Sequence, residues 1–121
     1  MFKKLDLAGI KVDLDDNLKK YVNHKIGKLD KYLPKQVRDV AHLEVRLKEV
    51  KNNVNNSCVC EVIVNLPKEK IAISEATLNL YAAIDIVEEK LKHKFLKYKQ
   101  LHSSTKFYRH LASRFRKNNS I

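Results

Sequence analysis

Acidic residues are absent from the chain after Glu89, although ten lysines and arginines follow that position. The 121-residue protein has 25 basic and 14 acidic side chains and a formal net charge of +11. Residues 1–89 therefore contain all 14 acidic residues and only 15 of the 25 basic ones. Nearly all of the excess positive charge lies after residue 89. Like charges crowded into one segment repel each other in a compact fold, so this pattern indicates a polyanionic partner.

Glycines, cysteines and long apolar runs are also scarce, and each scarcity excludes a class of protein. Gly9 and Gly27 are too few for a glycine-rich loop around a nucleotide phosphate. No run approaches the roughly 18 apolar residues of a membrane-spanning helix. Asp6 interrupts the N-terminus before the apolar segment of a secretory signal develops. Cys58 and Cys60 would share one face of an extended segment, too close for a relaxed disulfide. We expect a cytoplasmic protein whose thiols are reduced and buried.

Catalytic and metal-binding patterns are also missing. The histidines lack the spacing of metal ligands and have no clustered carboxylates beside them. No combination of serine, histidine and carboxylate suggests a nucleophile, and no pair of groups suggests acid–base catalysis. We therefore expect a protein that is not an enzyme and that uses no cofactor or metal ion. The histidines are His24, His42, His93, His102 and His110.

The first half of the chain predicts a strand followed by a helix. Residues 2–8 alternate, with Leu5 and Leu7 apolar, and indicate a short strand. Asp15 fits a helix N-cap. The apolar residues that follow are spaced by three or four and predict one amphipathic helix, which Pro34 ends near Leu33. These residues are Leu18, Val22, Ile26, Leu29 and Leu33.

From Val37 the apolar period changes to two, and three strands are expected before a long final helix. The strands are centred on residues 41–48, 58–66 and 71–74, with turns at 51–57 and 67–70. The final helix is expected over residues 77–101 because its apolar residues keep a spacing of three and four. They are Leu80, Ile84, Val87, Leu91, Phe95 and Tyr98.

This order predicts an α+β fold, a β-α-β-β-β-α two-layer sandwich with two helices packed on one face of a four-stranded sheet. The first two strands should be parallel and the later pairs antiparallel. Residues 1–101 form the expected domain. Residues 102–121 form a basic tail, expected to be flexible or helical only under some conditions.

The lysines of the final helix fall on its two flanks. At 100° per residue, with Leu91 at the centre of the apolar stripe, three lysines follow one flank and two the other. Only Lys92 has an acidic residue, Glu88, one turn before it. The ordinary interpretation is a solvated face of snorkelling lysines, but the missing acidic partners favour an RNA-type polyanion. The three are Lys90, Lys94 and Lys97, and the two are Lys92 and Lys99.

On the first helix, Lys25 and Lys28 are the expected second half of a groove, whereas Lys19 and Lys20 fit an ordinary surface. Tyr98 at the edge of the stripe fits the core, and stacking on a base is the alternative.

Several segments resemble one known family over about residues 1–101. Leu80-Tyr81-Ala82-Ala83-Ile84-Asp85, followed by Lys90-Leu91 and Lys97, resembles a Met-Tyr-Ala-Ala-Ile-Asp segment of the ribosome hibernation promoting factors. That family also carries the names ribosome-associated inhibitor and subunit-interface protein. Residues 18–32 and 5–9 are similar to its first helix and first strand.

The resemblance implies a domain similar to double-stranded-RNA-binding domains, in a monomer that binds ribosomal RNA of the small subunit at the subunit interface. Members occupy the groove for messenger and transfer RNA and silence idle ribosomes in stationary phase or stress. The chain resembles the short form, without a dimerisation domain. A family acidic residue is Asn79 here and a common arginine is His93. By position, the RNA-contacting candidates are Lys25, Lys28, Lys90, Lys94 and Lys97.

Two other functions fit some of the same features. A general duplex-RNA-binding module, acting in ribosome assembly or RNA turnover, would also need a basic surface. Residues 107–117 could be a basic amphipathic membrane anchor, although they contain only about three apolar anchors. We expect no membrane partner and no small-molecule substrate.

Overall fold

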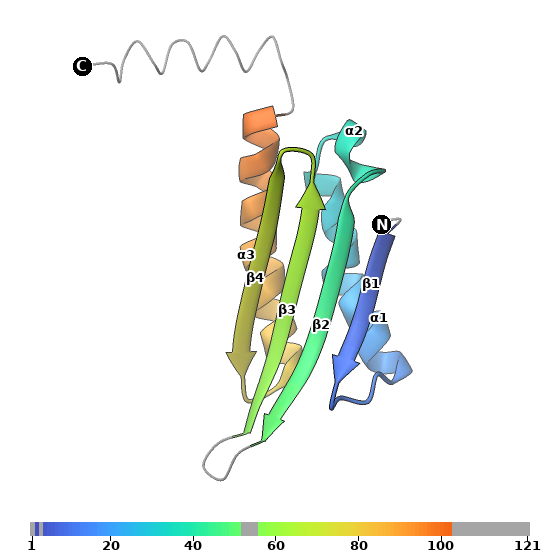
Figure 1. Ribbon diagram of the computed structural model, residues 1–121, viewed down its shortest axis with the longest axis vertical. Helices are drawn as coiled ribbons and strands as arrows, with labels where there is room; N and C mark the ends of the chain where they lie inside the picture. Colours follow the sequence, from blue (N-terminus) through green and yellow to red (C-terminus); the bar gives the residue numbers. More distant parts are fainter. Residues whose placement is uncertain (1, 3, 52–55, 103–121) are drawn as a thin grey trace, which may run out of the picture.

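The computed structural model describes residue 2, residues 4–51 and residues 56–102. The expected tail and most of the expected turn at 51–57 lie outside these residues. Figure 1 shows a sheet with helices behind one face only. The elements in chain order are β1 (Lys4–Ile10), α1 (Asp16–Lys25), the 3-10 helix η1 (Gly27–Tyr32), α2 (Lys35–Arg38), β2 (His42–Lys51), β3 (Asn56–Leu66), β4 (Glu69–Thr77) and α3 (Leu80–His102).

The sheet has the predicted mixed topology, with the strands in the order β1-β2-β3-β4. β1 pairs with β2 in parallel, from Lys4 opposite His42 to Ile10 opposite Lys48. The β2–β3 and β3–β4 pairs are antiparallel. The parallel pair requires a crossover, and α1, η1 and α2 supply it. The α+β prediction is confirmed.

The core lies between the sheet and the two long helices. Alternate residues of β2 and β3 point inward, so that Val45 and Val62, opposite each other across the strands, are both fully buried. The predicted stripe of α3 faces them, and its largest fully buried side chain is that of Phe95. The ring of Phe95 contacts that of Phe2, with 5.9 Å between the centroids and a tilt of 58°.

The first helix is shorter than its apolar pattern predicted. α1 ends at Lys25, and the chain continues as a 3-10 helix that begins at Gly27. Ile26 closes the last α-type hydrogen bond to Val22, whereas Leu29 bonds back only three residues, to Ile26. Residues 26, 29 and 33 are all buried as predicted, and their spacing of three and four is that of an α-helix face, so it could not reveal the tighter helix over residues 27–32. Glycine at position 27 also weakens the α-helix there.

The first helical segment ends at Tyr32, close to the predicted stop before Pro34, but the residues after Pro34 were assigned wrongly. Lys35–Arg38 form the short helix α2, so the strand does not begin at Val37, and β2 starts only at His42. Pro34 precedes the helix, where its fixed φ is compatible with a helix start. Val37 is nevertheless buried, and this burial explains its place in the apolar pattern.

The predicted caps are confirmed in part. Asp15 Oδ1 accepts a hydrogen bond of 2.7 Å from the amide of Leu18 and caps α1. The final helix begins at Leu80 rather than at Thr77, because the side chain of Asn79 accepts a 2.7 Å bond from the amide of Tyr81. β4 runs through residue 77 instead of ending at Ser74, and β1 is shifted two residues later than expected.

Candidate nucleic-acid interface

One groove lies between the first helical segment and α3, and we call it the inter-helix groove. It has a volume of about 280 Å³, and its lining includes four lysines and two glutamates. α1 and η1 supply one wall, and the flank of α3 that carries Glu88, Glu89 and Lys92 supplies the other. The charged lining residues are Lys25, Lys28, Lys31, Lys92, Glu88 and Glu89.

A second groove lies on the opposite flank of α3, against the last strand, and we call it the strand-side groove. Its volume is about 320 Å³, and Ile73 of β4 forms its apolar floor. Lys90, Lys94 and Lys97 line it together with His93. Lys94 and Lys97 are exposed and have no ion pair among the residues that the structure describes. The predicted row of three lysines is therefore one continuous wall.

The two grooves change how the candidate lysines are grouped. We expected Lys25 and Lys28 to form the second half of a groove; they line one with Lys92, on the flank of α3 opposite to Lys90, Lys94 and Lys97. Lys99 is exposed and lines neither groove. α3 is thus a ridge with lysines on both sides, because its buried stripe divides the remaining surface into two flanks.

Two of the candidate lysines have carboxylate partners that the sequence pattern did not show. Lys90 of α3 bonds to Glu75 of β4. Lys25 lies 3.7 Å from Asp85 and 3.8 Å from Glu88, both on α3. A pattern along one helix contains only neighbours on that helix, whereas these carboxylates come from elements packed against the lysines. Part of the charge of both lysines is therefore balanced within the domain.

Asp85 also receives a hydrogen bond of 2.5 Å from the hydroxyl of Tyr21. This bond, with burial and the charge of Asp85, raises the pKa of Tyr21 to about 12. The ring of Tyr21 meets Tyr81 edge to face at 4.8 Å, and the amine of Lys25 lies 5.7 Å from its centroid. These contacts hold α1 against α3 at one end of the inter-helix groove.

Tyr32 lies beside two lysines of the same groove. The amine of Lys31 is 5.2 Å from the centroid of its ring, and that of Lys92 is 5.3 Å from it. Lys31 was not among the candidates that the sequence suggested. The adjacent lysine and tyrosine at positions 31 and 32 were the available sequence signal. They indicate a site only in the folded protein, where α3 places Lys92 near the same ring.

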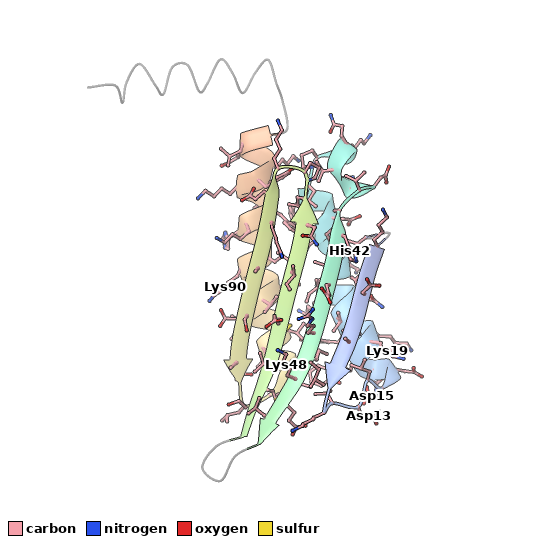
Figure 2. All side chains as sticks on the ribbon, viewed as in Figure 1. Asp13, Asp15, Lys19, His42, Lys48 and Lys90 are labelled. Atoms are coloured by element: carbon pink, nitrogen blue, oxygen red, sulfur yellow. The ribbon has the colours of Figure 1, made fainter. Side chains whose placement is uncertain are left out.

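The open face of the sheet has a different electrostatic character. Arg46 pairs with Glu44 at 3.0 Å and with Glu61 at 3.5 Å, and Lys48 pairs with Glu61 at 3.7 Å. At the start of β2, Nε2 of His42 lies 2.8 Å from Oδ2 of Asp6. Figure 2 shows Lys48 and His42 on the sheet, away from Lys90 on the outer side of α3. The cations in the middle of this face are therefore paired with carboxylates, unlike Lys94 and Lys97 on α3.

Three smaller expectations can also be compared with the structure. The hydroxyl of Tyr98 bonds to the carbonyl of Pro67 at 2.9 Å, and its side chain is buried, so the ring belongs to the core and not to a stacking surface. Both cysteines are free, but Cys58 is only half-buried, whereas Cys60 is fully buried. Within the described ranges we find no cluster of metal-binding side chains and no helix long and apolar enough to cross a membrane.

Comparison with known proteins finds relatives that carry the name ribosome hibernation promotion factor. It is 32% identical over 98 residues to a ribosome hibernation promotion factor of Lactococcus lactis, covering 79% of this chain and 49% of that protein. A factor of the same name from Staphylococcus aureus is 30% identical over 96 residues, covering 79% of this chain and 48% of that protein. The chain thus spans about half the length of the curated relatives that it matches.

Solved structures show the same fold at lower identity. The N-terminal domain of Protein Y from Thermus thermophilus has a TM-score of 0.67 and 24% identity, covering 81% of this chain and 99% of that one. A ribosomal subunit interface protein from Coxiella burnetii has a TM-score of 0.62 and 22% identity, covering 79% of this chain and 97% of that one. The family model described as "Sigma 54 modulation protein / S30EA ribosomal protein" matches residues 5–102. The chain therefore belongs to the Sigma 54 modulation protein / S30EA ribosomal protein family.

Proposed function

We propose that this protein binds the small ribosomal subunit and inhibits translation in stationary phase or stress, without catalysing a reaction. In this proposal it occupies the groove that messenger and transfer RNA use and is a monomer when off the ribosome. Its place of action would then be the cytoplasm. The curated relatives carry the name ribosome hibernation promotion factor, which supports a role at the ribosome.

One observation carries the proposal: four lysines with no carboxylate partner among the described residues line two grooves on the helical face, while Arg46 and Lys48 in the middle of the sheet face are paired with carboxylates. Lys28 and Lys92 line one groove, and Lys94 and Lys97 line the other. The ridge of α3 between two basic grooves can contact phosphates on both sides, as on a folded RNA surface. The whole candidate set for RNA contact remains Lys25, Lys28, Lys90, Lys92, Lys94, Lys97 and Lys99.

The proposal is tested by adding the purified protein to separated ribosomal subunits and sedimenting them at low and moderate salt. We expect the protein to sediment with the small subunit, with less of it bound as salt increases. Small subunits already loaded with messenger and initiator transfer RNA should bind less of it. Large subunits serve as the control. Recovery only in the ribosome-free fractions at low salt would end the proposal.

Free duplex RNA distinguishes the alternative function. A general duplex-RNA module recognises the shape of the A-form helix and should bind a free duplex as tightly as it binds intact small subunits. We expect the small subunit to be preferred, and addition of the protein to a cell-free translation reaction to reduce its output. Equal affinity with no effect on translation would favour the duplex-RNA module.

A further inference from the structure

Lys31 of η1 and Lys92 of α3 each lie beside the same aromatic ring, although they are far apart in the sequence. Their amines lie 5.2 Å and 5.3 Å from the centroid of Tyr32. An aromatic ring attracts cations through the negative charge of its face. Two lysines repel each other, so a shared ring offsets part of the cost of bringing them together.

The surroundings of these two lysines leave their charge available. Glu88 and Glu89 line the same groove, but Glu88 contacts Lys25 at 3.8 Å. Among the residues that the structure describes, no carboxylate lies within 4.0 Å of the amine of Lys31 or Lys92. The groove therefore has a neutralised end at Lys25 and a cationic end around Tyr32.

The ring itself is fixed in place. Tyr32 is half-buried and packs against the core, at the end of the 3-10 helix whose neighbours Leu29 and Leu33 are buried. A fixed ring restricts the flexible lysine side chains before any ligand arrives. Restricting them beforehand lowers the entropy that binding must remove.

We propose that Tyr32 is a positioning residue that gathers Lys31 and Lys92 into one binding site for a phosphate of the RNA backbone. This Tyr32 clamp rests on the proposed function for its natural ligand, but its chemistry requires only a phosphate group. Phenylalanine at position 32 keeps the ring face and should preserve the clamp. Leucine or methionine fills similar space without a ring and should release both amines.

The first test measures binding to purified small subunits for the wild type, Y32F, Y32L and Y32M. We expect Y32L and Y32M to bind about two- to fivefold more weakly, in line with the worth of an exposed cation–π interaction, and Y32F to bind like the wild type. The same changes are then made in a K31Q/K92Q background. Tyr32 acts through the lysines if its replacement has no further effect there.

The second test follows lysine side chains by NMR while inorganic tripolyphosphate is added. In the free wild type, the ring of Tyr32 should shift the ε-methylene signals of Lys31 and Lys92. Those two signals should respond first to tripolyphosphate, and Y32L should abolish this preference. The single variants K31Q and K92Q and the double variant K31Q/K92Q form a double-mutant cycle for tripolyphosphate binding. Because Tyr32 is unchanged in this cycle, the test remains decisive even if the Tyr32 variants fold poorly. A shared phosphate predicts that their effects are not additive.

The outcomes separate the clamp from the proposed function. Preferential tripolyphosphate binding at the two lysines, without binding to small subunits, would support the clamp and overturn the proposed function. Tight small-subunit binding that Y32L leaves unchanged, or weakens equally in the K31Q/K92Q background, would overturn the clamp alone. Additive effects of K31Q and K92Q on tripolyphosphate binding would also overturn it.

Discussion

The hydroxyl of Tyr21 in α1 donates a 2.5 Å hydrogen bond to Asp85 in α3, two residues that are 64 positions apart. Asp85 belongs to the segment Leu80–Asp85, which first suggested the family. The bond gives that segment a structural role, because it connects α1 to α3, the helices on either side of the inter-helix groove. Lys25, 3.7 Å from the same carboxylate, completes the junction.

Replacing Tyr21 with phenylalanine should remove this hydrogen bond and keep the ring contact with Tyr81. We expect the free energy of unfolding of Y21F at neutral pH to be about 1 kcal/mol lower than that of the wild type, because this is the usual net contribution of one hydrogen bond. Chemical denaturation of both proteins measures the difference. A variant as stable as the wild type would show that the bond contributes nothing to stability.

The same pair predicts a pH dependence with a definite sign. The pKa of Tyr21 rises from 10.0 to about 12 on folding, because the protonated hydroxyl is the form that donates to Asp85. Its stabilising contribution is therefore complete below pH 10 and is lost as the pH rises towards 12. The stability difference between the wild type and Y21F should shrink over that interval. A constant difference would contradict the assignment.

Charge removal in each groove should show which flank of α3 meets RNA. We expect K28Q/K92Q and K94Q/K97Q each to weaken small-subunit binding. Every phosphate that a variant no longer neutralises should reduce the slope of log affinity against log salt by about 0.7 to 0.9. K48Q on the sheet face is the control, because Lys48 pairs with Glu61 and lies on the strands, away from α3. If K48Q weakens binding as much as the groove variants do, the helical face is not the interface.

Glu88 should oppose RNA binding, because it places a negative charge in a basic groove. Its replacement by glutamine leaves Lys25 with Asp85 as its carboxylate partner. We expect E88Q to bind small subunits about two- to threefold more tightly, in line with exposed charge interactions of less than about 1 kcal/mol. Titrations at two salt concentrations would show the gain decreasing at the higher one. Weaker binding would instead mean that Glu88 itself contacts the RNA.

The two cysteines should differ in reactivity although they lie two residues apart. Burial, with a smaller effect of Glu61, raises the pKa of Cys60 from 9.0 to about 12, so its thiolate is rare at neutral pH. Cys58 is only half-buried, and its thiol lies 3.8 Å from the carbonyl of Leu78. A thiol reagent should modify Cys58 in the native protein and Cys60 only in denaturant, as mass spectrometry of C58S and C60S would show. Equal native labelling would contradict this burial.

Local sequence patterns predicted most of the fold because they record which side of each element meets the core. Alternation in residues 58–66 located β3, and Asp15 was identified as the cap of the first helix. The apolar positions 26, 29 and 33 were also identified correctly as buried. They could not reveal the change to a 3-10 helix at Gly27, because their spacing of three and then four fits an α-helix, and Leu33 lies beyond the end of the 3-10 helix.

The sequence by itself determined that this chain forms an α+β sandwich with an excess of lysines on its last helix. Only the tertiary structure decided which lysines are neutralised and which are not. Lys90 bonds to Glu75 on a neighbouring strand, while Lys31 and Lys92 come together at Tyr32 from two different elements. Charge interactions act through space over a few ångströms. Their partners therefore depend on how the helices pack, which a periodicity along the chain does not contain.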